Sequence, residues 1–140
     1  MKVQIRQGVF ETNSSSTHSI TMCSGQEWKD WMDDKIRMSP DGNPKFLPRD
    51  EAIEANIKHA LEYYDLSENN TEDRQIIEKY RNTGDIDEFG DAIDEYFDKY
   101  ECYLTYDEWD DYFDYEKYRD SYTTASGEEV VAFGYYGNDY

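Results

Sequence analysis

The sequence predicts an α+β fold, in which a small antiparallel sheet built from N- and C-terminal strands packs against several short acidic helices. Three observations support this class. Both ends of the chain carry short runs of apolar and β-branched residues, which are typical of strands. The central part carries apolar residues at helical spacing. The length of 140 residues, without an internal repeat or a linker, fits a single domain over 1–140.

The strands are predicted at the two ends of the chain. Residues 3–10 alternate apolar and polar side chains, residues 11–16 have the short polar side chains of a turn, and residues 17–23 return to a strand pattern. Near the C-terminus, residues 121–133 have the pattern of strand, turn and strand. We expect residues 3–10 and 129–134 to belong to one antiparallel sheet, because both are apolar and β-branched.

Two capping boxes predict where short helices begin. Ser24 with Glu27, and Thr105 with Glu108, each pair a cap hydroxyl with a carboxylate three residues later. In contrast, the three prolines of the chain all lie within 39–48 and predict a loop there.

Apolar residues at helical spacing predict three further helices in the centre of the chain. One covers residues 50–64, and the next ends near Gly84, because glycine commonly terminates helices. The third and most regular covers residues 85–100, where apolar residues line one face.

Acidic residues line another face of the predicted helix 85–100. They lie four, three and four residues apart, at Asp87, Asp91, Asp94 and Asp98. Neighbours at this spacing lie close together on a helix, and like charges there repel. A second acidic set follows in the sequence at Asp107, Glu108, Asp110, Asp111, Asp114 and Glu116. We expect both sets to contact a partner.

The charge of the chain restricts the partner. With 33 acidic and 14 basic residues, the formal net charge is −19. Nucleic acid and anionic membranes would repel such a protein, whereas a basic groove would attract it. The N-terminus has no apolar stretch of a signal peptide and no segment is long enough to span a membrane, so we expect a cytoplasmic protein.

Candidate catalytic and metal-binding residues are few. The run Ser14–Ser16 with His18 contains a nucleophile and a base, but its composition is that of a hydroxyl-rich turn, and we expect these residues to be structural. We expect His59 to be partly buried and hydrogen-bonded. Cys23 and Cys102 form no CxxC pair, so we expect two buried, reduced thiols. No cofactor or metal site is predicted; the segment from Asp85 to Gly90 lacks the later ligands of a calcium loop.

The two ends of the chain resemble those of small, mostly uncharacterised proteins encoded by phages and mobile elements of Gram-positive bacteria. The segments that carry the resemblance are RQGVFETNSSSTHS at 6–19 and TTASGEEVVAFGYYG at 123–137. The acidic middle lies outside it. The resemblance implies a phage protein that acts on host machinery, and by analogy it suggests an inhibitor of the anti-CRISPR or another anti-defence type.

We therefore expect a binding protein rather than an enzyme. Carboxylates on helical ridges with interleaved aromatic rings can imitate nucleic acid and enter the basic groove of a host nucleic-acid-binding effector, such as an RNA-guided nuclease. Two alternatives stay open: a hydrolase-like enzyme that uses the Ser14–His18 turn, and an acidic phage regulatory or structural protein without mimicry. The acids could also serve only solubility.

Overall fold

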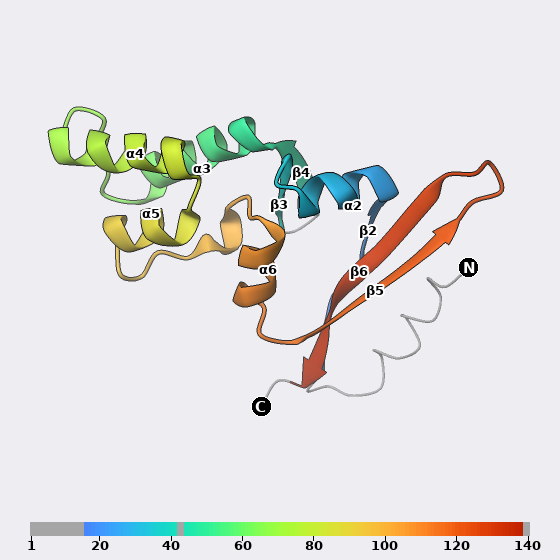
Figure 1. The fold of residues 1–140 in the computed structure, drawn as a ribbon. Coiled ribbons are helices and arrows are strands. Elements are labelled where there is room, and N and C mark those ends of the chain that lie inside the picture. The colour runs from blue at the N-terminus through green and yellow to red at the C-terminus, as the bar shows by residue number, and fades with distance from the viewer. Residues whose placement is uncertain (1–15, 42–43, 139–140) are drawn as a thin grey trace.

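Helices and strands occupy different parts of the molecule in the computed structural model, which describes residues 16–41 and 44–138 (Figure 1). A long, twisted antiparallel sheet lies at one end, and most of the helices lie at the other end. This arrangement confirms the predicted α+β class.

The strands of the larger sheet come from both ends of the chain. β6 (Glu129–Asn138) lies at the centre and β5 (Glu116–Thr123) pairs with it along one edge. β1 (Ser16–His18) and β2 (Thr21–Ser24) pair with it in succession along the other edge. All of these pairs are antiparallel, as expected. The strand expected over 3–10 lies outside the described residues.

β1 and β2 behave as two parts of one strand. His18 lies opposite Tyr136 and Thr21 lies opposite Phe133, so the register continues across the two residues between the strands. The predicted strand over 17–23 is therefore confirmed, with a short interruption in its middle.

The C-terminal hairpin is longer than the sequence predicts. β5 begins at Glu116, five residues before the expected start at Ser121, so the last member of the second acidic set lies on a strand. The strands are joined by residues 124–128, where Gly127 has a φ of 92°. A left-handed conformation of this kind favours glycine.

Two helices begin at the predicted capping boxes, α2 (Gly25–Met32) and α6 (Tyr106–Tyr112). In each, the cap hydroxyl accepts a hydrogen bond from the backbone N–H three residues later, and the glutamate there accepts one from the cap N–H. Both helices contact the face of the sheet that carries Phe133. The rings of Trp31 and Trp109 lie 5.2 and 5.7 Å from the Phe133 ring, between centroids. The core is thus strongly aromatic.

The loop predicted over 39–48 is wrong at both of its ends. β3 (Ile36–Ser39) and β4 (Lys45–Pro48) form a two-stranded antiparallel hairpin. The prolines lie beside the strands or at the end of one, where the ladder needs no N–H donor. On the other side of β3, Met38 exchanges two backbone hydrogen bonds with Leu104, a partner far away in the sequence.

The next two predicted helices are confirmed as α3 (Arg49–Tyr63) and α4 (Thr71–Thr83). Gly84 ends α4 in the left-handed conformation, with a φ of 68°. Between the two helices, the buried amide of Asn56 donates a hydrogen bond of 2.8 Å to the hydroxyl of Tyr80.

The helix predicted over 85–100 is wrong in its second half. α5 (Ile86–Ile93) ends after eight residues, and Asp94 is already extended. A turn follows, and then the short 3₁₀ helix η1 (Lys99–Glu101).

Packing explains why α5 ends where it does. The chain folds back so that the Phe97 ring lies against Gly90, where a Cβ atom would be only 2.5 Å from Cδ2 of Phe97. The same ring packs 4.9 Å from that of Tyr64, between centroids, and the Tyr64 hydroxyl accepts a hydrogen bond from the backbone N–H of Asp98. A straight helix would lose these contacts with α3.

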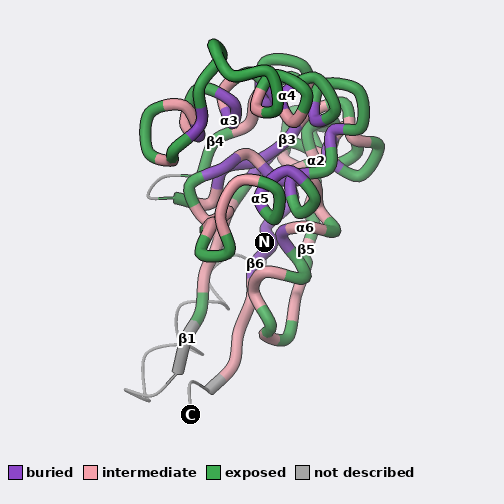
Figure 2. Tube along the Cα trace, turned by 90° about the vertical axis from the view of Figure 1, so that its left-hand side faces the viewer, coloured by how far each residue is buried: buried purple, intermediate pink, exposed green. Residues whose placement is uncertain are grey.

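The buried residues lie between the helices and where α2 and α6 meet the sheet, and the outward sides of the helices are exposed (Figure 2). Cys23 and Cys102 are both buried and unpaired, as expected. Burial raises the pKa of each thiol to about 12, which keeps it protonated and unreactive at neutral pH. In the described part of the chain, no helix combines the length and the apolar character needed to cross a membrane.

Candidate partner-binding surface

The four aspartates of the predicted stripe come together, although they do not lie on one helix. They line a surface hollow of about 180 Å³ between α5, the turn that follows it and α6. We call it the acidic hollow, and its main lining residues are Asp87, Asp91, Asp94, Asp98, Lys99 and Tyr112. Lys99 is the one basic residue between 85 and 116.

Two of these carboxylates are held by side chains inside the hollow. Oδ1 of Asp87 lies 2.8 Å from Nζ of Lys99, whose side chain is only 12% exposed. Oδ1 of Asp98 accepts a hydrogen bond of 2.9 Å from the Tyr112 hydroxyl. Burial, together with that bond to a carboxylate, raises the pKa of Tyr112 to about 12. The hollow is therefore an ordered structure rather than a loose group of charges.

The carboxylates of the other two aspartates, Asp94 and Asp91, differ in their hydrogen bonding. Asp94 follows the last residue of α5, and its Oδ1 accepts a hydrogen bond of 2.9 Å from the backbone N–H of Tyr96. Asp91 is exposed, and no hydrogen bond or ion pair joins its carboxylate to another described residue. Asp91 is thus the member of the stripe that is most available to a partner.

The second acidic set lies along α6 and the start of β5, and most of it is exposed. Asp110 is paired, with Oδ1 3.1 Å from Nζ of Lys117. No ion pair to described residues involves the remaining exposed members, which are Asp107, Asp111, Asp114 and Glu116. These four carboxylates extend the negative surface beyond the acidic hollow.

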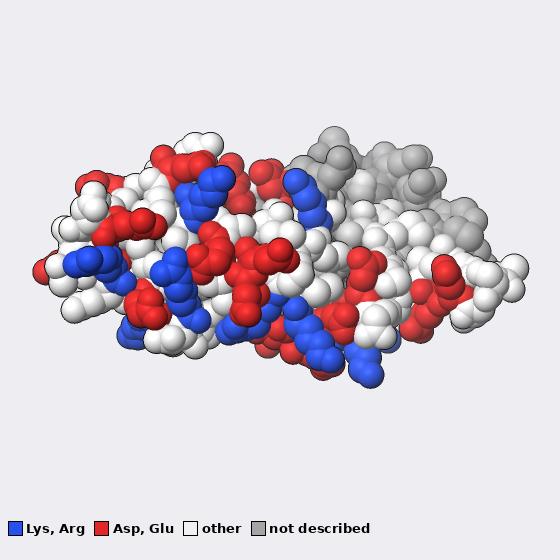
Figure 3. All heavy atoms as spheres, turned by 90° about the horizontal axis from the view of Figure 1, so that it is seen from above, with Lys and Arg blue, Asp and Glu red and all other residues white. Residues whose placement is uncertain are grey.

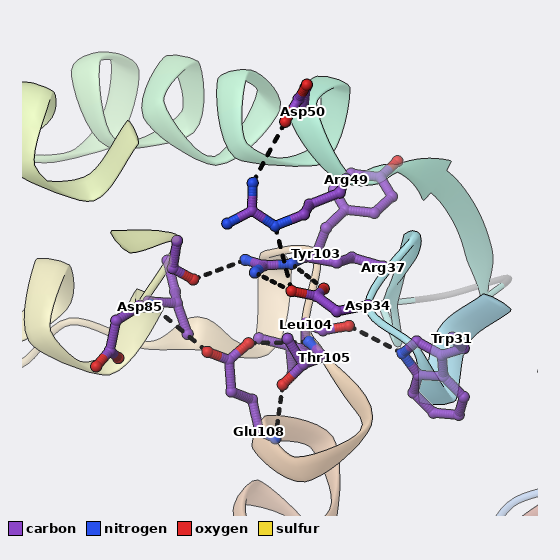
Figure 4. Close-up of polar contacts among 12 residues, drawn as sticks. Trp31, Asp34, Arg37, Arg49, Asp50, Asp85, Tyr103, Leu104, Thr105 and Glu108 are labelled. Atoms are coloured by element: carbon purple, nitrogen blue, oxygen red, sulfur yellow. Dashed lines mark hydrogen bonds and ion pairs between the residues drawn. The ribbon is translucent and has the colours of Figure 1, made fainter. Parts of the chain in front are cut away.

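Glu108 does not belong to this surface, because its carboxylate points into the protein (Figure 4). It accepts hydrogen bonds from the backbone N–H groups of Thr105 at 2.9 Å and Ile86 at 3.4 Å. Burial raises its pKa above the ordinary carboxyl value, although these bonds oppose the shift. The structure gives Glu108 the role of joining α6 to the start of α5, and we leave it out of the proposed contact surface.

A buried arginine holds together the elements behind the hollow (Figure 4). Arg37, 2% exposed, donates two hydrogen bonds to Asp34, at 2.9 and 3.0 Å, and one of 2.8 Å to the carbonyl oxygen of Gly84. Arg49 adds a third contact to Asp34 at 3.2 Å. These bonds connect β3 and α3 to the end of α4, next to the start of α5.

Three carboxylates could ligate a metal ion. One oxygen each of Asp85, Asp87 and Glu108 lies within 4.8 Å of the others. All three already have partners: Asp85 caps α5, Asp87 binds Lys99 and Glu108 accepts backbone hydrogen bonds. A cation would have to compete with these groups. The segment that begins at Asp85 is helical from Ile86, so it does not form a calcium loop.

The two histidines lie in different surroundings. Ser14 and Ser15 of the alternative catalytic turn lie outside the described residues, whereas His18 lies on β1, exposed and opposite Tyr136. His59 is partly buried, as expected, and its Nε2 lies 3.4 Å from Oε2 of Glu101.

Several acids elsewhere have basic neighbours. Figure 3 shows acidic and basic side chains interleaved over the helical end of the molecule. On this end, Arg81 donates two hydrogen bonds, of 2.8 and 2.9 Å, to Glu54, and Lys79 pairs with Glu88. The segment 85–120, which forms the acidic hollow, α6 and most of β5, has 15 acidic and three basic residues, so most of the net charge of −19 lies there.

Comparison with known proteins adds no relative: no protein-family model, no curated protein and no solved structure matches the chain. Sequence reasoning missed Lys99, Tyr112 and Tyr64 as parts of the site. No spacing pattern identifies them, because each contacts Asp87 or Asp98 from a segment more than one helical turn away in the sequence.

Proposed function

We propose that this protein is an acidic inhibitor that mimics nucleic acid and occupies the basic groove of a nucleic-acid-binding host effector. The observation that carries the proposal is the convergence of four aspartates on one ordered hollow, which continues into the exposed acids of α6 and β5. Its biological setting would be the cytoplasm of a host cell, and its class would be anti-CRISPR or another anti-defence inhibitor. An RNA-guided nuclease is one effector of this type.

The proposed mechanism is competition for cationic side chains. Arginine pairs with a carboxylate in much the same two-pronged geometry that it uses for phosphate. A surface with a net negative field also attracts a basic groove from a distance and speeds association. No chemical step is needed, because an occupied groove cannot hold its nucleic acid.

The exposed acids and the hydrogen-bonded acids would have different roles. Asp91, Asp107, Asp111 and Asp114 are exposed without ion pairs to described residues, so they would make direct contacts. Asp87, Asp94 and Asp98 are held in place by intramolecular bonds and would contribute mainly to the field. Preorganised charges need no ordering when the partner binds, which favours affinity.

Competition with DNA tests the proposal. The immobilised protein would be exposed to host lysate at low salt, and the captured basic protein would then be challenged with a duplex DNA. We expect the DNA to release the captured protein, and raised salt to weaken capture. Capture that duplex DNA does not affect, or that is independent of salt, would contradict mimicry.

A further inference from the structure

An aromatic groove lies on the side of the molecule where α2, α6 and the sheet meet. It has a volume of about 210 Å³, and we define it by the residues that shape it: Trp28, Tyr106, Trp109, Lys117, Arg119 and Phe133. Its cations lie over its rings. The guanidinium carbon of Arg119 is 5.4 Å from the centroid of Trp28, and Nζ of Lys117 is 5.6 Å from that of Trp109.

The two cations of the aromatic groove differ in availability. The Lys117 ammonium pairs with Asp110 and also donates to backbone carbonyl oxygens, so its charge is neutralised and its donors are used. Arg119 is exposed, and beyond its contact with Trp28 its guanidinium has neither an ion pair nor a hydrogen bond within the described residues. In a chain with 33 acidic residues, an arginine held on a ring with unused donors is suited to receive a carboxylate from outside.

A complementary feature lies on the turn after α5. Among the large hydrophobic residues that the structure describes, Tyr96 has the highest exposure, 82%, and it makes no ring contact with them. Its backbone N–H is bound by Asp94, and the next residue, Phe97, is packed against α5. Glu95, beside it, is exposed. The turn thus presents an aromatic ring and a carboxylate on a fixed backbone.

We propose that the Glu95–Tyr96 turn of one copy docks into the aromatic groove of a second copy of this chain. Glu95 would pair with Arg119, and the Tyr96 ring would lie against Trp28 and Tyr106. Tyrosine, tryptophan and arginine are the residues that most often carry binding energy at protein interfaces. Because turn and groove are different surfaces, the contact is heterologous: it closes only if two copies exchange turns, and otherwise it extends into chains.

Charge determines the conditions in which this contact forms. Two copies with a net charge of −19 each repel one another, and salt screens that repulsion. We therefore expect self-association to strengthen as salt is raised. Capture of a basic partner has the opposite dependence, so the inference and the proposed function can fail independently.

A charge exchange tests the contact. Sedimentation velocity at high protein concentration in about 0.5 M salt, where the Debye length falls to roughly 4 Å, should show the wild type self-associating. Arg119→Glu alone and Glu95→Arg alone should each weaken this at least about tenfold, since each places like charges in contact. An equimolar mixture of the two variants should associate again, because the exchanged charges then attract. Tyr96→Ser should abolish association.

The matched control is Glu62→Arg, which makes the same change in charge beside Tyr63, another exposed tyrosine. It should self-associate like the wild type. A wild type that stays monomeric in high salt, a mixture that fails to associate, or a control as defective as Glu95→Arg would each overturn the proposal. Thermal melts of every variant would show whether the fold is intact, and all three substituted charges are exposed.

Discussion

The hydroxyl of Tyr112 donates a hydrogen bond to Oδ1 of Asp98, with 2.9 Å between the oxygens. The same carboxylate oxygen accepts a hydrogen bond from the backbone N–H of Tyr100 and so caps η1. Asp98 therefore connects α6 to the chain that leaves α5, and it shapes the acidic hollow. An acid on the open side of a regular helix would have neither role.

This relationship predicts that Asp98→Ala destabilises the protein. The change removes a cap and leaves Tyr112 without its acceptor, so the free energy of unfolding should fall by about 1–2 kcal/mol. Asp91→Ala is the matched control, and as an exposed, unbonded site it should change stability by less than about 0.5 kcal/mol. Urea unfolding of both variants gives the comparison. Equal or increased stability of Asp98→Ala would mean that Asp98 stabilises neither η1 nor Tyr112 and only repels its acidic neighbours.

The ion pair between the buried Arg37 and the partly exposed Asp34 gives a second prediction. Arg37→Gln removes two hydrogen bonds to Asp34 and the one to the carbonyl oxygen of Gly84, so the free energy of unfolding should fall by about 2–3 kcal/mol. Arg74→Gln removes an exposed arginine and should have little effect. Denaturant titration of both variants tests this, and a loss below about 1 kcal/mol for Arg37→Gln would mean that Arg49 alone can satisfy Asp34.

Local signals predicted local structure well. The two capping boxes, at Ser24 and Thr105, and the glycine end of α4 depend on residues within one turn of each other, and all three are present. The strand patterns at the two ends of the chain also correctly predicted an antiparallel sheet within an α+β fold.

Long-range contacts explain what the sequence did not reveal. β3 is held partly by Leu104, and α5 ends where Phe97 turns back onto Gly90 and Tyr64. Neither contact has a signature in its own segment. The sequence pattern placed the four aspartates of the stripe together on the face of one helix. They do lie together, but in a hollow that is formed partly by the turn after α5.

The raised pKa of Glu108 predicts how pH affects stability. A carboxyl group whose pKa is higher in the folded than in the unfolded protein binds more protons when folded, so its contribution to stability falls as pH rises through the folded-state value. In Glu108→Gln, the side-chain oxygen can still accept the hydrogen bond from the backbone N–H of Thr105, and the amide does not titrate. The variant should therefore lose less stability than the wild type as pH rises from below the ordinary carboxyl pKa to neutrality.

Unfolding free energies of both proteins across this pH range test the prediction. The difference between the two proteins is the relevant quantity, because the other carboxylates titrate in both. Identical pH profiles would show that the pKa of Glu108 is not raised by folding.

The last prediction concerns the exposed acids themselves. Asp91→Lys with Asp111→Lys reverses two carboxylates that bond to nothing else in the described chain, so the melting temperature should stay the same or rise slightly as repulsion is relieved. If these residues contact the basic effector, its affinity for the double variant should fall at least about tenfold, or ~1.4 kcal/mol. The control, Glu51→Lys with Glu128→Lys, changes the net charge equally on α3 and in the β5–β6 turn. Long-range attraction depends on total charge and would weaken alike in both variants, mainly through slower association, whereas loss of direct contacts would speed dissociation only in the first. Association and dissociation rate constants, measured by surface binding of the captured effector, separate these two effects. Equal rate constants for both variants would mean that Asp91 and Asp111 contribute only to the general negative field.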